Sequence, residues 1–141
     1  MSDDFKAFMT APAIKSLEVS YVASKRFTDE TGEPIAWKFH PITAAENDRL
    51  IEENTTKFVG AIGKQETNTD MNGYMMALLA ACITYPNLKD EELQKYYGAI
   101  GADDLVSRML LPGELTDLFK AVSQANGFEN DMDRKIKKAK N

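Results

Sequence analysis

The sequence predicts a mainly α-helical domain with an N-terminal β-hairpin, an α+β fold packed around one central apolar helix. The longest apolar run in the chain, residues 70–85, repeats apolar side chains at helical spacing. Before this run, two segments alternate apolar and polar side chains about a turn, which is typical of a hairpin. After it, short apolar stripes alternate with glycine and proline stop signals, which is typical of a series of short helices.

Composition limits the class of protein and its partners. The chain has 141 residues, 43% of them hydrophobic and 28% charged, which fits one globular domain. Its net charge of −5 argues against nucleic acid as a partner, because nucleic-acid binding usually rests on a basic surface. The apolar run is shorter than the roughly 20 residues that cross a membrane, so no membrane partner is expected. The acidic start MSDDFKAFM lacks the basic region of a signal peptide, which favours a cytoplasmic location.

Residues 17–42 form the predicted hairpin. A short helix over 3–9 comes before it, with Phe5, Phe8 and Met9 on one side. Alternation from Leu17 to Phe27 predicts the first strand, and Ile35, Trp37 and Phe39 predict the second. The segment between them, TDETGEP, has the residues of a turn, and Pro41 should end the second strand.

A helical core over residues 43–128 should follow the hairpin. Thr43 and Glu46 make a capping box, which predicts a helix over 44–57. Residues 60–69 are polar and contain two glycines, so we expect a mobile loop there. The central helix over 70–85 then runs to Pro86, which stops it.

Three more helices are predicted, over 90–97, 102–111 and 114–126. Glycine or proline follows each of the first two, and Gly127 is a predicted C′ residue of the third. The third helix should turn an inner stripe to the core: Leu115, Leu118, Phe119 and Val122. Residues 129–141 are basic, and we expect a frayed helix or a disordered tail. The whole chain is therefore predicted to be a single domain.

The sequence offers little for catalysis. His40 is the only histidine and Cys82 the only cysteine, too few for a structural zinc site. No phosphate-binding glycine motif is present, and the acidic pairs lie near predicted helix N-termini or on solvated faces. We therefore expect no enzymatic activity, no cofactor and no metal.

Methionine usage points instead to a surface for partners. Flexible thioether side chains suit adaptable binding surfaces, although core packing is the more common use. The predicted partner-binding residues lie around the central helix and the turn near residue 110: Met71, Met75, Met76, Met109 and Leu111.

A set of short segments, in order and at matching spacing, resembles a known family. Each is weak alone, but together they cover most of the chain from Ser24 onward. They are Ser24-Lys25-Arg26-Phe27, Gly32-x-Pro34-Ile35-x-Trp37, Ala81-Cys82, Pro86-Asn87-Leu88-Lys89-Asp90, Glu92-Leu93-Gln94, Tyr97-Gly98, Gly101-Ala102, Met109-Leu110, Pro112-Gly113-Glu114 and Asn126-Gly127-Phe128. On these segments the chain resembles the XkdN-like phage tail assembly chaperones of contractile-tailed phages, related prophages and tail-like bacteriocins. It departs from the family before Ser24 and over residues 60–69.

The resemblance implies a non-enzymatic protein of tail morphogenesis. It implies binding to the long helical tape-measure protein, which is kept soluble until tube subunits assemble around it. The tail tube protein is a further implied partner, and self-association is possible. The implied location is the host bacterial cytoplasm, with no copy in the mature particle. Family members often have a second, frameshifted form, and Lys137-Lys138 could be encoded by a slippery run of adenines. The alternative is a structural tail component of the virion or bacteriocin.

Overall fold

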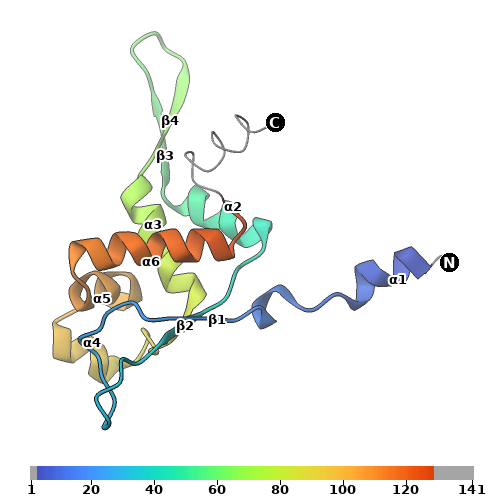
Figure 1. Cartoon of the computed structure of the whole chain (residues 1–141). Coiled ribbons are helices and arrows are strands. Elements are labelled where there is room, and N and C mark those ends of the chain that lie inside the picture. The colour runs from blue at the N-terminus through green and yellow to red at the C-terminus, as the bar shows by residue number, and fades with distance from the viewer. Residues whose placement is uncertain (1–2, 129–141) are drawn as a thin grey trace, which may run out of the picture.

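Helix α3 (Met71–Cys82) lies at the centre of the fold, and the other main helices pack around it. This computed structural model describes residues 3–128. Figure 1 shows a helical body, a small sheet along one side of it, a projecting two-stranded hairpin and an N-terminal arm. The predicted combination of helices with N-terminal antiparallel strands is thus confirmed at this level. The predicted basic tail over 129–141 lies outside the described residues.

The N-terminal arm leads into a three-stranded sheet. Helix α1 (Asp3–Thr10) and the short 3-10 helix η1 (Ile14–Ser16) form the arm, which extends away from the body in Figure 1. Strand β1 (Val19–Tyr21) then pairs antiparallel with β2 (Trp37–Phe39). Both strands are shorter than predicted.

A long connection over residues 22–36 joins β1 to β2 and contains a turn of its own. Thr28 and Pro34 form an isolated bridge, and Gly32 adopts a φ of 86° that favours glycine. In β2, the side chains of Trp37 and Phe39 are buried and Lys38 is exposed, so the predicted alternation is confirmed. The predicted N-terminal hairpin is therefore roughly as expected.

Helix α2 (Ala44–Glu53) begins where the sequence predicts and ends four residues early. The Thr43 hydroxyl accepts from the Glu46 N–H at 3.1 Å, which completes the capping box. The predicted end at residue 57 is wrong, because strand β3 (Thr55–Val59) begins two residues after the last residue of α2, Glu53. β-Branched Thr55 and Thr56 favour an extended backbone, and pairing with another strand decides between the two states.

The partner strand of β3 is β4 (Gln65–Thr69). The prediction of a mobile loop over residues 60–69 is therefore wrong for residues 65–69. The two strands are antiparallel over five residue pairs, from Thr55–Thr69 to Val59–Gln65. Gly63, at φ 80°, belongs to the turn between them. Most side chains of this hairpin are exposed and polar, so its sequence lacks the alternation of apolar and polar residues that predicts a strand.

Helix α3 ends three residues earlier than predicted, at Cys82. Its N-terminus is capped by Asp70, whose carboxylate accepts from the Gly73 N–H at 2.9 Å. Residues Ile83–Tyr85 form strand β5, which pairs antiparallel with β2 on the side opposite β1. The free edge of β2 offers backbone hydrogen bonds that a continued helix would leave unused.

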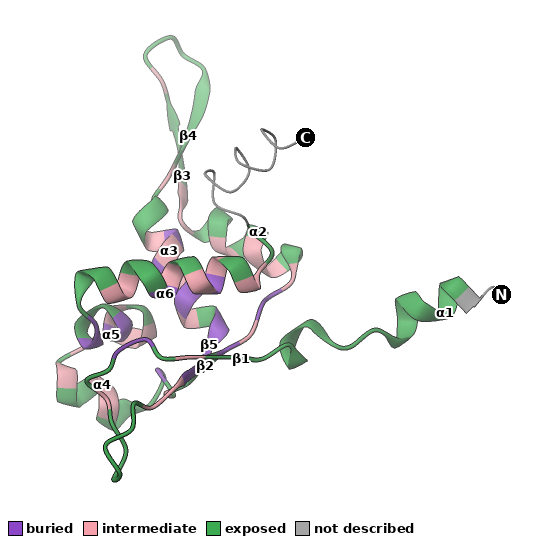
Figure 2. Ribbon diagram, in the orientation of Figure 1, coloured by how far each residue is buried: buried purple, intermediate pink, exposed green. Residues whose placement is uncertain are grey.

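Three helices complete the body, close to their predicted bounds. They are α4 (Glu91–Tyr97), α5 (Gly101–Met109) and α6 (Pro112–Ala125). Leu118 and Val122 of α6 are fully buried, as the predicted inner stripe requires, while Leu115 and Phe119 are half-buried. Helices α2, α5 and α6 all contact α3, whose lower turns are buried (Figure 2). Among residues 3–128, no helix is long and apolar enough to span a membrane.

Leu79 tests the central position of α3. Its side chain is fully buried, and we expect Leu79→Ala to lower the free energy of unfolding by about 3 kcal/mol, because it leaves a cavity among three helices. Urea unfolding followed by circular dichroism measures the change. The exposed Ile62→Ala change in the β3–β4 turn is the control and should stay within about 0.5 kcal/mol. An equal loss in both variants would contradict a core centred on α3.

The helix caps predict an acid dependence of stability. The Thr43 N–H lowers the pKa of Glu46, and the Leu111 N–H lowers the pKa of Glu114. A carboxyl with a lowered folded-state pKa stabilises the fold above its ordinary pKa of 4.5, and this contribution is lost as the pH falls through the folded value. We expect the double variant Glu46→Gln, Glu114→Gln to flatten the fall in urea stability below pH 4.5. Glu30→Gln, in the turn before β2, is the control and should leave the pH profile unchanged.

Candidate functional site

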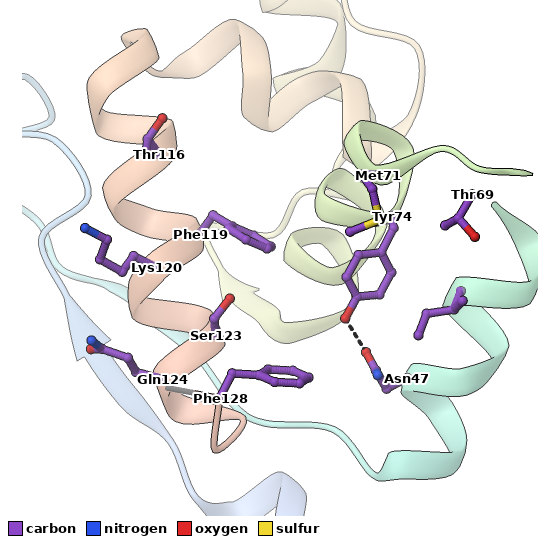
Figure 3. A pocket seen from close by; sticks show the side chains of 11 residues that line it. Asn47, Thr69, Met71, Tyr74, Thr116, Phe119, Lys120, Ser123, Gln124 and Phe128 are labelled. Carbon is purple, nitrogen blue, oxygen red and sulfur yellow. Dashed lines mark hydrogen bonds between the residues drawn. The ribbon is translucent and has the colours of Figure 1, made fainter. Parts of the chain in front are cut away.

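An apolar groove lies on the surface between α2, α3 and α6. Its volume is about 780 Å³, within the range of small-molecule and side-chain pockets. It is lined by Asn47, Ile51, Thr69, Met71, Tyr74, Thr116, Phe119, Lys120, Ser123, Gln124 and Phe128. Figure 3 shows these side chains on facing elements around one hollow.

One wall and the floor come from α2 and α3. Asn47 and Ile51 are four residues apart on α2, so they share a face of that helix. The Tyr74 hydroxyl of α3 donates to the Asn47 side-chain oxygen and joins the two helices across the floor (Figure 3). Burial raises the pKa of Tyr74, which keeps the phenol neutral and able to donate at physiological pH.

The opposite wall is one face of α6. Its lining residues recur at spacings of three and four, from Thr116 to Gln124, beside the buried stripe of Leu118 and Val122. Phe119 points across the hollow towards α3, whereas Lys120 and Gln124 project from the side of α6 that faces away from it (Figure 3).

The end of α6 closes one end of the groove. Gly127 adopts a φ of 87°, which lets the chain reverse, and the Phe128 N–H donates to the Ser123 carbonyl at 3.0 Å. This return places the Phe128 ring at the groove (Figure 3). The amide of Asn126 also accepts from the Ile42 N–H at 2.9 Å, which fixes the helix end to the segment before α2.

The groove is suited to apolar binding. Lys120 is the one charged residue among its eleven lining residues, and no carboxylate, histidine or cysteine is among them. Aromatic and aliphatic side chains at its centre with amides and hydroxyls at its rim match an apolar ligand face with a polar edge.

The five predicted partner-binding residues do not form one surface. Met71 is 65% exposed and lines the groove, and Met75 is half-buried against the core. Leu111 is 56% exposed, at the other end of α6, where it is the N-cap residue. Met76 and Met109 are only 9% and 4% exposed, so in this conformation neither offers the contact predicted for it.

Helix geometry explains this division. Consecutive residues are 100° apart around a helix, so Met75 and Met76 cannot face the same side, and Met76 faces the core. Ile51 and Phe128 line the groove and were missed as site residues. Gly127, as the predicted C′ residue, was the available signal for a reversal of the chain at this point, but nothing in the sequence places Phe128 opposite Met71.

The histidine and the cysteine of the chain, His40 and Cys82, are not among the residues that line the groove. His40 is half-buried, and its Nδ1 lies 2.7 Å from the Pro41 carbonyl oxygen. Cys82 is fully buried, and burial raises the pKa of its thiol. Within residues 3–128, no cluster of three or more His, Cys, Asp or Glu side chains could hold a metal ion.

Comparison with known proteins gives a consistent result. Residues 5–140 match the model of the phage XkdN-like tail assembly chaperone proteins. The chain is 30% identical over 140 residues to the phage-like element PBSX protein XkdN of Bacillus subtilis strain 168, covering 98% of this chain and 94% of that protein. It is 31% identical to the protein YqbN of the same organism, covering 98% of this chain and 93% of the relative. A crystal structure of YqbN superposes with a TM-score of 0.74 at 25% identity and covers 92% of this chain and all of that one.

Cys82 offers a test of how firmly the groove's floor helix is packed. We expect its thiol to react with Ellman's reagent at least about a hundredfold more slowly in the native protein than in urea, because the sulfur is buried and its pKa is raised. An Ile62→Cys variant adds an exposed thiol in the β3–β4 turn, which should react at the rate of the unfolded chain. Fast labelling of native Cys82 would show that the end of α3 opens readily.

Proposed function

The chain belongs to the phage XkdN-like tail assembly chaperone family, and from this premise we propose that it binds the tape-measure protein in the groove between α2, α3 and α6. In this role it keeps the tape-measure protein soluble in the host cytoplasm until tail tube subunits assemble around it. It is then released and is absent from the mature particle. A chaperone family of this kind is generally non-enzymatic, which agrees with the apolar character of the groove.

The observation that carries the proposal is the shape and chemistry of the groove. The tape-measure protein is expected to be long and helical, with apolar stripes that aggregate unless covered. An amphipathic helix binds by laying such a stripe into an apolar groove, with anchors at helical spacing. Phe119, Met71 and Tyr74 offer the apolar surface for these anchors, and the hydroxyls and amides of α6 lie along the rim.

Release favours modest affinity at each site. A groove of about 780 Å³ accepts only a few side chains, so the contact at one site is small beside the roughly 1,600 Å² that a standard stable interface buries. Many copies bound along one long tape-measure protein can still keep it soluble, because each bound copy covers a further part of its exposed apolar surface. Tube subunits can then displace the copies one at a time. Coverage by many weak contacts therefore suits a chaperone better than one strong contact does.

Variants that place aspartate at a helix N-terminus test the site without harming the fold. Met71→Asp lies in the first turn of α3, in the groove, where a carboxylate is favourable for the helix. Ile100→Asp is its matched control, at the exposed N-cap of α5 and away from the groove. Leu111→Asp, at the N-cap of α6, tests the second predicted surface.

We expect Met71→Asp to weaken binding of the tape-measure protein by about a hundredfold, because the client would bury a charge against an apolar face. Co-expression with the tape-measure protein, followed by measuring its soluble fraction, checks this. Ile100→Asp and Leu111→Asp should keep the client soluble. Loss with Leu111→Asp alone would move the site to the α5–α6 turn, and retention by all three variants would exclude both surfaces.

A structural role in the particle is the alternative function. Mass spectrometry of purified tails separates the two, since a chaperone leaves and a tube or baseplate component stays. The proposed second, frameshifted form is tested by the coding DNA, where the absence of a slippery heptamer and of an overlapping frame would remove it.

A further inference from the structure

The N-terminal arm carries a helix whose apolar side faces solvent. Phe8 of α1 is 84% exposed, and Met9 beside it is also largely exposed. Asp4 and Lys6 lie on the two flanks of this apolar side and Thr10 lies nearly opposite it, so α1 is amphipathic. An isolated helix of eight residues is marginal in water, and burial of its apolar side against another surface stabilises it.

The arm between α1 and the body holds this helix away from its own groove. Backbone hydrogen bonds close η1, with the Leu17 N–H donating to the Ile14 carbonyl at 3.1 Å, and β1 then fixes the root of the arm to β2. In Figure 1 α1 lies beyond the body, far from α3 and α6. Residues 11–18 can span up to about 26 Å when extended, which is enough to reach a neighbouring molecule.

The groove and α1 match in size and chemistry. Eight residues of helix are about 12 Å long, and the lining stretch of α6 from Thr116 to Gln124 has the same length. The groove's centre is aromatic and aliphatic, which suits Phe8 and Met9. Lys120, its one charged lining residue, lies at the rim that α6 forms and projects away from the hollow, so Asp4 on the flank of a docked α1 can meet it at that rim.

We propose that α1 of a second copy of this chain docks in the groove between α2, α3 and α6, and that two copies exchange their arms in a symmetric dimer. Each dimer then contains two identical helix-in-groove contacts, as a two-fold interface requires. The exchange covers Phe8 and the groove of both chains at once. The inference rests on the groove and the arm and does not require the proposed function.

Self-association of the full chain is the first test. Sedimentation velocity should show a mass that rises from one chain towards two over about 10–300 µM, as weak contacts of this size predict. Phe8→Asp should weaken the dimer at least about tenfold, because the anchor becomes a charge. Ile100→Asp, at an equally exposed apolar residue, is the matched control and should leave the dimer unchanged. A single-chain mass at all concentrations, or an unchanged dimer in Phe8→Asp, would overturn the proposal.

Disulfide trapping between two different variants tests the geometry. Cys82 is fully buried and can stay in place. When Asp4→Cys chains are mixed with Lys120→Cys chains under mild oxidation, we expect a mixed disulfide dimer, because Asp4 is the residue that a docked α1 places near Lys120. Replacing the second variant with Glu30→Cys, in the exposed turn before β2, should abolish it. If a chain carrying both Asp4→Cys and Lys120→Cys forms only an internal disulfide, the arm docks on its own body and the exchange is wrong.

The two proposals can fail separately. Phe8→Asp should remain able to keep the tape-measure protein soluble, since its groove is intact. Loss of client binding in Met71→Asp with no dimer in the wild type would leave the function standing and overturn the exchange. A wild-type dimer that Phe8→Asp dissociates, with client binding retained in Met71→Asp, would support the exchange and overturn the client site.

Discussion

The burial of α3 among α2, α5 and α6 is the interaction on which the rest of this structure depends. Leu79 and Cys82 have no exposed surface and Leu78 almost none, so most of the second half of the helix is buried, although Ala81 is exposed. Two of the neighbouring helices contribute fully buried side chains to this core, α5 with Leu105 and Val106 and α6 with Leu118 and Val122. The sheet is attached to the same helix, because β5 continues directly from its last turn.

The candidate site follows from the way α3 leaves this core. Its first turn emerges between α2 and α6, so Met71 and Tyr74 lie at a surface although they belong to the central helix. Close approach at this point depends on Gly73, where a Cβ atom would come within 2.5 Å of the Asn54 side-chain oxygen. The Asp70 N–H donates to the Asn54 carbonyl at 2.7 Å, which fixes the base of the β3–β4 hairpin beside the groove.

An apolar groove on a free chaperone has a physical cost, because exposed apolar surface favours aggregation. Covering it with a weakly bound amphipathic helix lowers that cost and leaves the site accessible to a client that binds better. The arm and the groove are then two parts of one equilibrium between self-association and client binding. In such an equilibrium, any segment that competes for the groove raises the client affinity needed to displace it.

The sequence by itself determined the local features and the family. Caps at Thr43 and Asp70, the helix stops near Gly98 and Pro112, and the alternation of Trp37 and Phe39 are set by side chains close in the chain, and all were predictable. Short segments spread from Ser24 to Phe128, in the family's order and spacing, were enough to indicate the tail assembly chaperones. Only the tertiary structure decided that residues 55–59 and 83–85 are strands, because their partners lie elsewhere in the chain and a short polar or β-branched segment is compatible with either state. The tertiary structure also decided that Met71 is at the groove and Met76 in the core. The sequence of a helix that is apolar on nearly every side does not show which side the neighbouring helices leave exposed.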